Sequence, residues 1–555
     1  MKVKKESSRV VKPTYEGTPP TNTSYTPLSV FDKVSYDDHM AVIYAYRPPT
    51  PPNAALELGL AKALSVYREW AGRLGKNDEG EPVILLNDKG VRFVEASVGC
   101  TLDQAMPFQP SASLLALHPS WKGVEELVQV QLTRFTCGSM VVGFTAHHLV
   151  ADGRSTSDFL VAWGRACRGL EIDPTPSRDR GIFSPRDPPR FEFEHRGAEF
   201  TTKKIKKDYR YIDDIIMDDV LMHRVHFSYE FLAKLKAKAS AMNGTNKTYS
   251  TFESLVAHLW RAITKATSLG GFETTRVTIS VDGRTRLNPR VPTEYFGNLV
   301  LWASPSAKAE DLLREPLPHA AKLIHDAVSR VNNNYFKSFI DFASYKAEEE
   351  ALVSTTDANK SALYPNLEVA SWLRFPFYDV DFGGGCPYIF MPSYLPREGT
   401  MFLLPSFVGD GSIDAFVPLF RDNLASFKQI CYSLDYYVWI LIQRQRLRVL
   451  AKQNGNRSRL KSCCAFLNLR REGEARRENC IVFKSAVAAA ATLSIFSGGT
   501  NNYHLDEAKA ARSIEKILGE DYLGDEEEAI SKFMSTEAKR DAGLLFRVLR
   551  IMIDS

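Results

Sequence analysis

Two residues in the first third of the chain could support acid–base chemistry: His148 and Asp152, in the order H-x-x-x-D. They close the strongly apolar segment MVVGFTAHHLVADG, which predicts a buried strand ending in a turn at Asp152–Gly153. A side chain at that point emerges where a rigid scaffold presents catalytic groups. Neutral imidazole accepts a proton near neutral pH, so His148 could deprotonate a nucleophile attacking a thioester, worth about 10²–10⁴ in rate.

The same pair of residues also has an alternative interpretation. A histidine and an aspartate four positions apart arise by accident in a chain this long, and a core histidine often makes only structural hydrogen bonds. His147, one residue earlier, is expected to face the other side of the strand, where it would pack or hydrogen-bond.

A second candidate segment is DFGGG, which begins at Asp381 and ends at Gly385. Its glycines, Gly383 among them, permit positive φ angles and a close approach of the backbone to another group. Such a segment could cradle a phosphate, but no G-x-x-x-x-G-K-[ST] motif is present, so it is not a P-loop. A structural turn is the favoured interpretation.

The elements that must position these residues alternate between strands and helices. One helix is predicted to begin after Asn53 and to end at Gly75. Further helices are predicted at 155–168, 251–267 and 319–330. Ser250 and Glu253 form a capping-box pattern at the start of the helix predicted for 251–267. Strands are predicted at 128–135, 140–147, 223–230, 276–286 and 298–304. The alternation predicts an α/β protein with two main domains.

We expect four parts along the chain. The predicted ranges are 1–190 for an N-terminal domain that contains His148, 191–214 for a crossover loop, 215–435 for a C-terminal domain with DFGGG, and 436–555 for an atypical extension, disordered or partly helical.

Composition excludes several classes of protein. The net charge of +4 over 555 residues is small, which argues against nucleic acid as the main partner. The eight cysteines form no C-x-x-C pair and no zinc spacing, so we expect no metal and a reducing, cytoplasmic environment. No apolar run approaches the roughly 18 residues of a membrane span, and the N-terminus does not read as a signal peptide.

HHLVADG followed by DFGGG about 230 residues later resembles the paired HxxxD and DFGWG motifs of the BAHD acyltransferases. The resemblance extends from about residue 8 to 435, through PLSVFDKV, YSTFESLVAHLWR, DGRTRLNPRVPTEYFGNLVLWA and DGSIDAFVPLF. It is greatest for the grass agmatine, tryptamine and putrescine hydroxycinnamoyltransferases, which make amides. The resemblance implies a chloramphenicol-acetyltransferase-like fold of two domains joined by a crossover loop, with a central channel.

The resemblance also implies roles for particular residues. His148 matches the general base in the channel, and Asp152 matches an aspartate that orients the loop. Asp381 matches an aspartate that holds the fold through an arginine, for which Arg284 or Arg286 is the candidate.

Substrate positions follow from the same comparison. Trp372 and Tyr44 match positions that line the channel, and Ser250 and Thr251 lie where the family approaches the coenzyme A phosphates. The partners implied are an acyl-CoA co-substrate and a small amine, with no separate cofactor, and the chain is expected to be a monomer. Two departures are Gly384, where the family motif has tryptophan, and the extension at 436–555, which has no counterpart.

Alternatives remain open at this point. The string HHxxxDG also occurs in peptide-synthetase condensation domains, although no carrier module is present. A serine hydrolase is disfavoured because no G-x-S-x-G elbow appears. An ester-forming enzyme acting on an alcohol such as shikimate, or a non-catalytic protein that keeps the fold, would have the same motifs. A cationic amine would favour a carboxylate in its site, but Asp37, Asp38 and Asp158 cannot be placed there from sequence.

Overall fold

The structure is a computed structural model, and it describes residues 1–20, 24–106, 108, 111–120, 122–202, 220–241, 248–269, 273–356, 363–393 and 397–434. The predicted extension at 436–555 lies outside the described residues, as do positions 203–214 of the predicted crossover loop. Residues 1–432 form one compact unit.

Within the described residues, the first sheet has six strands, in the order β1 (Val3–Val11), β6 (Val91–Val98), β7 (Val128–Phe135), β8 (Met140–His147), β3 (His39–Tyr46) and β16 (Ile389–Pro392). Strands β6 and β7 are parallel, whereas the other neighbours are antiparallel. Strand β8 is buried along its whole length, as its continuous apolar sequence predicts. Strand β16 comes from the predicted C-terminal domain, so the second half of the chain completes the first sheet.

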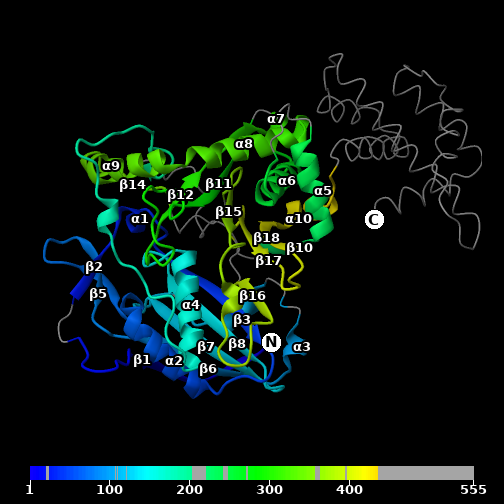
Figure 1. The fold of residues 1–555 in the computed structure, drawn as a ribbon. Coiled ribbons are helices and arrows are strands. Elements are labelled where there is room, and N and C mark those ends of the chain that lie inside the picture. Colours follow the sequence, from blue (N-terminus) through cyan, green and yellow to red (C-terminus); the bar gives the residue numbers. More distant parts are fainter. Residues whose placement is uncertain are drawn as a thin grey trace, which may run out of the picture. The chain divides into compact units, whose positions relative to one another are not determined.

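Helices α2 (Asn53–Val66) and α4 (Gly153–Cys167) contact each other beside this sheet (Figure 1). The prediction that one helix continues to Gly75 is wrong. The chain leaves the helix after Val66, makes a 3-10 turn, and enters β4 (Arg73–Lys76), where Gly75 pairs with Val83. Strand pairing therefore overrides helical periodicity there. The small sheet formed by this segment consists of β2 (Ser24–Pro27), β5 (Pro82–Leu86) and β4.

The second sheet, among the residues that the structure describes, contains seven strands: β10 (Val220–Phe227), β18 (Ile413–Phe420), β17 (Thr400–Pro405), β15 (Leu367–Ser371), β11 (Thr274–Asp282), β12 (Val300–Ala303) and, paired with β11, β13 (Ser306–Lys308). Strand β15 runs parallel to both of its neighbours. The predicted strands in this half of the chain are confirmed, with shifts of a few residues at their ends.

The helices of the second half are α5 (Tyr229–Ser240), α6 (Thr251–Ala266), α7 (Ala309–Arg314), α8 (Leu317–Arg330), α9 (Asn333–Glu349) and α10 (Arg421–Ile430). Helix α6 contacts α5, α7, α8 and α10, and it is buried on nearly all sides because other helices surround it (Figure 1). The capping box predicted for its start is confirmed, since Ser250 and Glu253 bond to each other's main chain.

The part of the predicted crossover loop that the structure describes packs against α9. Buried Glu199 accepts a hydrogen bond from Tyr335 of α9 at 2.9 Å, and buried His195 contacts Ser338 at 3.2 Å. Short elements complete the described fold: α1 (Val30–Lys33), α3 (Leu102–Ala105), and the pair β9 (Phe200–Thr201) and β14 (Val353–Ser354). Helix α1 contacts α9 and leads the chain toward the end of β8.

Candidate active site

His148 is the first residue after β8, and its side chain is half-buried. Its main-chain N–H donates to the carbonyl oxygen of Asp38 at 2.9 Å, and its ring nitrogen Nδ1 lies 2.9 Å from Ser35 Oγ. Burial lowers the pKa of His148 below the ordinary histidine value, although the charge of Asp152 partly opposes this shift. The imidazole is therefore neutral near pH 7, which is the form that accepts a proton.

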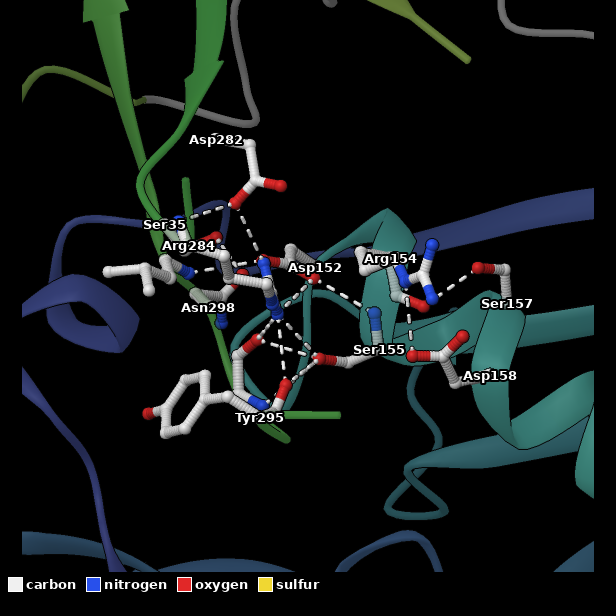
Figure 2. Close-up of polar contacts among 12 residues, drawn as sticks. Ser35, Asp152, Arg154, Ser155, Ser157, Asp158, Asp282, Arg284, Tyr295 and Asn298 are labelled. Atoms are coloured by element: carbon white, nitrogen blue, oxygen red, sulfur yellow. Dashed lines mark hydrogen bonds and ion pairs between the residues drawn. The ribbon is translucent and has the colours of Figure 1, made fainter. Parts of the chain in front are cut away.

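Asp152 and Arg284 form an almost fully buried ion pair, with 2.8 Å between Arg284 Nη1 and Asp152 Oδ2 (Figure 2). Asp152 Oδ1 also accepts from the main-chain N–H of Ser155 and so caps α4, while Oδ2 accepts from the N–H of Leu299. Burial alone would raise the pKa of Asp152, but Arg284 and these donors hold it below its ordinary value.

This ion pair joins the turn after His148 to the segment between β11 and β12. Arg284 Nη2 additionally donates to Ser155 Oγ at 2.9 Å and to the carbonyl oxygen of Tyr295 at 3.0 Å (Figure 2). Removing one partner of such a buried pair typically costs about 3–5 kcal/mol, because the other charge is left unpaired. The geometry gives Asp152 a structural position beside His148.

Arg284 is not the partner of Asp381, so that candidate pairing is corrected. Asp381 pairs instead with Arg168 at the end of α4, with Nη1 and Oδ2 3.2 Å apart. Arg284 is unavailable because its guanidinium is already engaged with Asp152. The other oxygen of Asp381 accepts from the main-chain N–H groups of Gly383 and Gly385, at 2.7 and 2.9 Å. Both glycines have φ angles near +100°, at 114° and 99°, which they adopt without strain.

Gly384 lies where the chain approaches the 48–50 segment closely. A Cβ atom at this position would stand 2.0 Å from the carbonyl oxygen of Pro49. A tryptophan, as in the family motif, would therefore clash with main-chain atoms here. The departure from DFGWG is matched by a local backbone arrangement that only glycine fits.

Glu368 of β15 is a residue near His148 that the sequence analysis did not identify. It accepts a short hydrogen bond from the hydroxyl of Tyr36, whose ring lies 5.5 Å from the ring of His148. The carboxylate is half-buried, and its charge acts on the pKa of His148. The guanidinium of Arg397 lies 5.9 Å from the centre of the Tyr36 ring. A lone glutamate in a strand gives no sequence signal, because its neighbours come from distant segments.

The candidate channel residues Trp372 and Tyr44 belong to one aromatic cluster. Phe390 lies between them, with its ring centre 4.9 Å from that of Tyr44 and 5.7 Å from that of Trp372. Phe377 stacks on Phe390 at 4.0 Å. Tyr44 is fully buried, and its hydroxyl has no hydrogen-bond partner within the described residues. Tyr44 lies in β3, and His148 directly follows β8, the strand that pairs with β3.

Ser250 and Thr251 lie at the start of α6, about 100 positions after His148 in the sequence. Ser250 is the N-cap, and its hydroxyl donates to Glu253 Oε2 at 2.7 Å. Glu253 also binds His325 Nδ1 at 2.7 Å. This helix start therefore already holds one carboxylate, and the N–H of Glu253 is bonded to Ser250. The N–H groups of the first two helical residues are the part that a phosphate could use.

The three aspartates considered from sequence have different surroundings. Asp37 is largely exposed and lies 3.5 Å from His147, whose pKa burial lowers to about 3. The main-chain carbonyl oxygen of Asp38 accepts a hydrogen bond from the N–H of His148. Asp158 is buried rather than exposed, and burial raises its pKa to about 6 even though Arg154 lies 3.2 Å away. None of them contacts the ring of His148 in the way that Tyr36 does.

Two searches of the described residues found nothing. No cluster of three or more histidine, cysteine, aspartate or glutamate side chains in that part of the chain could hold a metal ion. Nor does any helix there have the length and apolar character to cross a membrane.

Comparisons with known proteins show which family the chain resembles. The family model described as the Transferase family matches residues 1–434. The chain is 53% identical over 441 residues to agmatine coumaroyltransferase-1 of Hordeum vulgare, which covers 78% of this chain and 100% of that protein. It is 50% identical over 456 residues to putrescine hydroxycinnamoyltransferase of Oryza sativa subsp. japonica, with coverage of 78% and 100%.

A solved structure shows the same fold. TRI101 of F. graminearum, complexed with coenzyme A and deoxynivalenol, superimposes with a TM-score of 0.60 at 15% identity, over 73% of this chain and 97% of that one. The chain therefore belongs to the Transferase family, the BAHD acyltransferases that its paired sequence motifs indicated.

Proposed function

We propose that this protein transfers a hydroxycinnamoyl group from coenzyme A to a small cationic amine, such as agmatine or putrescine, with His148 as the general base. The relatives named for agmatine and putrescine support this choice of donor and acceptor. The position of His148 after β8 and its lowered pKa support its role, because the base must be neutral before it accepts a proton.

The reaction needs no covalent intermediate, because a thioester is already activated. The amine nitrogen attacks the thioester carbonyl carbon while His148 takes a proton from that nitrogen. The tetrahedral intermediate then loses the coenzyme A sulfur as the C–S bond breaks. The imidazolium returns the proton to this sulfur, so the products are an amide and free coenzyme A.

The observation that carries the choice of an amine acceptor is Glu368 beside His148. Agmatine and putrescine each bear a second cationic group, which a half-buried carboxylate would bind by a charge-assisted hydrogen bond. Tyr36 connects the two residues, since its hydroxyl bonds to Glu368 and its ring lies against His148. Shikimate carries a carboxylate that Glu368 would repel, which disfavours the ester-forming alternative.

The aromatic donor and coenzyme A are assigned to other parts of the site. Trp372, which is partly exposed, would contact the planar hydroxycinnamoyl group, and fully buried Tyr44 would support it from behind through Phe390. Ser250 and Thr251 would meet the coenzyme A phosphates through the start of α6. Acyl-CoA is a co-substrate in this proposal, and no separate cofactor takes part.

The test is thiol release from p-coumaroyl-CoA and feruloyl-CoA with agmatine, putrescine, tryptamine, serotonin or shikimate as acceptor. We expect turnover with agmatine or putrescine and none with shikimate. His148→Ala should lower kcat by about 10²–10⁴ while leaving the melting temperature close to that of the wild type. Turnover with shikimate alone would favour ester formation, and no turnover from folded protein would favour the non-catalytic alternative. The monomeric state and the cytoplasmic location remain predictions.

A further inference from the structure

The hydrogen bonds behind His148 begin at the carboxylate of Asp32, which is fully buried in α1. Its Oδ1 accepts from the main-chain N–H and from the side-chain Nδ2 of Asn298, both at 2.9 Å. Its Oδ2 accepts from Ser29 and from Arg180. Both oxygens accept in these contacts, and Arg180 pairs with the carboxylate.

These contacts fix the orientation of the Asn298 side chain. Its Nδ2 lies near three oxygens that can only accept: Asp32 Oδ1, the His148 carbonyl at 3.0 Å and the Leu149 carbonyl at 3.2 Å. A flipped amide would place its own oxygen against all three, with no donor between them. The amide oxygen Oδ1 therefore points toward Ser35, with 3.1 Å between Oδ1 and Ser35 Oγ.

The direction of the hydrogen bonds from Ser35 to Asn298 and to His148 follows from the single proton of the Ser35 hydroxyl. An amide oxygen only accepts, so the single hydroxyl proton of Ser35 goes to Asn298. Toward His148 Nδ1, 2.9 Å away, Ser35 Oγ can then only accept a hydrogen bond. The Nδ1 atom must carry the proton of that bond.

We propose that Asp32, Asn298 and Ser35 are positioning residues that hold the proton of neutral His148 on Nδ1 and leave the Nε2 lone pair for the acceptor amine. This inference rests on the proposed role of His148 as the base. When Nε2 takes the proton of the amine, Nδ1–H stays bonded to Ser35 Oγ, and the relay stabilises the imidazolium in one orientation.

The direct test is the ring-nitrogen NMR spectrum of protein labelled with ¹⁵N in its histidine rings. His148→Ala identifies the His148 signals by their loss. In the wild type at a pH where His148 is neutral, we expect a protonated shift for Nδ1 and an unprotonated shift for Nε2. In Ser35→Ala, the two shifts should move toward each other as the second tautomer becomes populated. A wild-type spectrum with the proton on Nε2 would overturn the relay.

Kinetics provide the second readout. Ser35→Ala should lower kcat with p-coumaroyl-CoA and agmatine by about 10-fold, part of the contribution of a general base, with little change in either KM. The matched control is Ser354→Ala, which removes a hydroxyl that bonds to the carbonyl of Val34 beside Ser35 but does not contact His148. The control should keep wild-type kcat.

The outcomes separate this inference from the proposed function. If wild type is active, His148→Ala is not, and Ser35→Ala keeps both wild-type kcat and wild-type ring shifts, the relay is wrong while the base assignment stands. If His148→Ala is fully active, the base assignment itself is wrong.

Discussion

The polar partners of His148 come from segments far apart in the sequence. Ser35 lies 113 positions before it, and Asn298 lies 150 positions after it. Each partner is in turn held by buried groups, which limits the orientations that the imidazole can adopt. A base that is already oriented loses less entropy when the acceptor arrives, and this contributes to rate independently of its pKa.

Glu368→Gln tests the acceptor side of the site at the residue scale. Glutamine keeps the shape and the acceptor for Tyr36 but removes the negative charge. A charge-assisted hydrogen bond contributes about 1.5–3 kcal/mol, so KM for agmatine and putrescine should rise about 10- to 100-fold. Steady-state kinetics with a fixed, saturating acyl donor would measure this change.

Controls make that experiment specific. KM for p-coumaroyl-CoA should stay near the wild-type value, and tryptamine, which has an indole in place of the second cation, should be affected less. Glu349→Gln changes a largely exposed carboxylate of α9 and should have no effect on either substrate. An unchanged KM for agmatine in Glu368→Gln would remove Glu368 from the acceptor site.

At the scale of elements, the turn from Asp381 to Gly385 joins α4 to the 48–50 segment. The carboxylate of Asp381 binds two N–H groups of the turn and Arg168 of α4. Gly164 lets α4 approach the same turn, since a Cβ there would stand 2.7 Å from the carbonyl oxygen of Asp381. The DFGGG motif is thus explained here by packing rather than by contact with His148.

Gly384→Ala tests this close packing. The new Cβ would stand 2.0 Å from the Pro49 carbonyl oxygen, so the turn must shift, and overpacking of this kind costs about 1–3 kcal/mol. We expect a lower melting temperature by thermal unfolding. Gly99→Ala is the matched control, because a Cβ at Gly99 meets nothing within 4 Å. Equal stability of the two variants would show that the turn relaxes freely.

At the scale of the whole molecule, buried neutral histidines make stability depend on pH. Burial lowers the pKa of His258 in α6 to about 4, whereas an unfolded histidine titrates near 6.5. Below pH 6.5 the unfolded chain therefore binds more protons than the folded one, and stability falls as pH falls. The titration of His258 alone should lower the free energy of unfolding by about 3 kcal/mol between pH 6.5 and 4.

The measurement is the free energy of unfolding of wild type and His258→Gln at several pH values between 6.5 and 4. Glutamine keeps a donor for the Cys431 carbonyl, which His258 Nε2 approaches at 2.6 Å. The variant should lose less stability with acid than the wild type does. Asp158 and Glu398, whose pKa values burial raises to about 6 and about 7, act in the opposite direction but equally in both proteins. Parallel pH profiles would contradict the assignment of His258.

Residues 1–432 form one compact unit, and the family model ends at residue 434. A chain shortened to end after Asp435 should therefore fold and keep the kcat of the full chain with p-coumaroyl-CoA and agmatine. Circular dichroism and the thiol-release assay would measure both properties. A shortened chain that is insoluble or inactive would show that residues 436–555 contribute to the fold or to the site.

The sequence by itself determined the family, the candidate base and most elements of regular structure. His148 and Asp152 can be recognised because they follow a buried, largely apolar strand. The capping box at Ser250 and Glu253 predicts the start of helix α6. These features depend on residues a few positions apart, and periodicity and capping are local properties of the chain. The prediction that a helix continues to Gly75 was wrong because a contact between distant segments, the pairing of Gly75 with Val83, outweighed the local helical pattern.

The tertiary structure alone decided which charged and polar groups meet. Arg284 pairs with Asp152, 132 positions away, and Asp381 pairs with Arg168. Glu368 reaches the site only because β15 of the second sheet brings it to Tyr36, 332 positions away. Each of these contacts depends on the path of the whole backbone, and any of several arginines or carboxylates satisfies the sequence pattern equally well. Burial then selects the pairs, since a charge removed from water must find a partner that the fold places within reach.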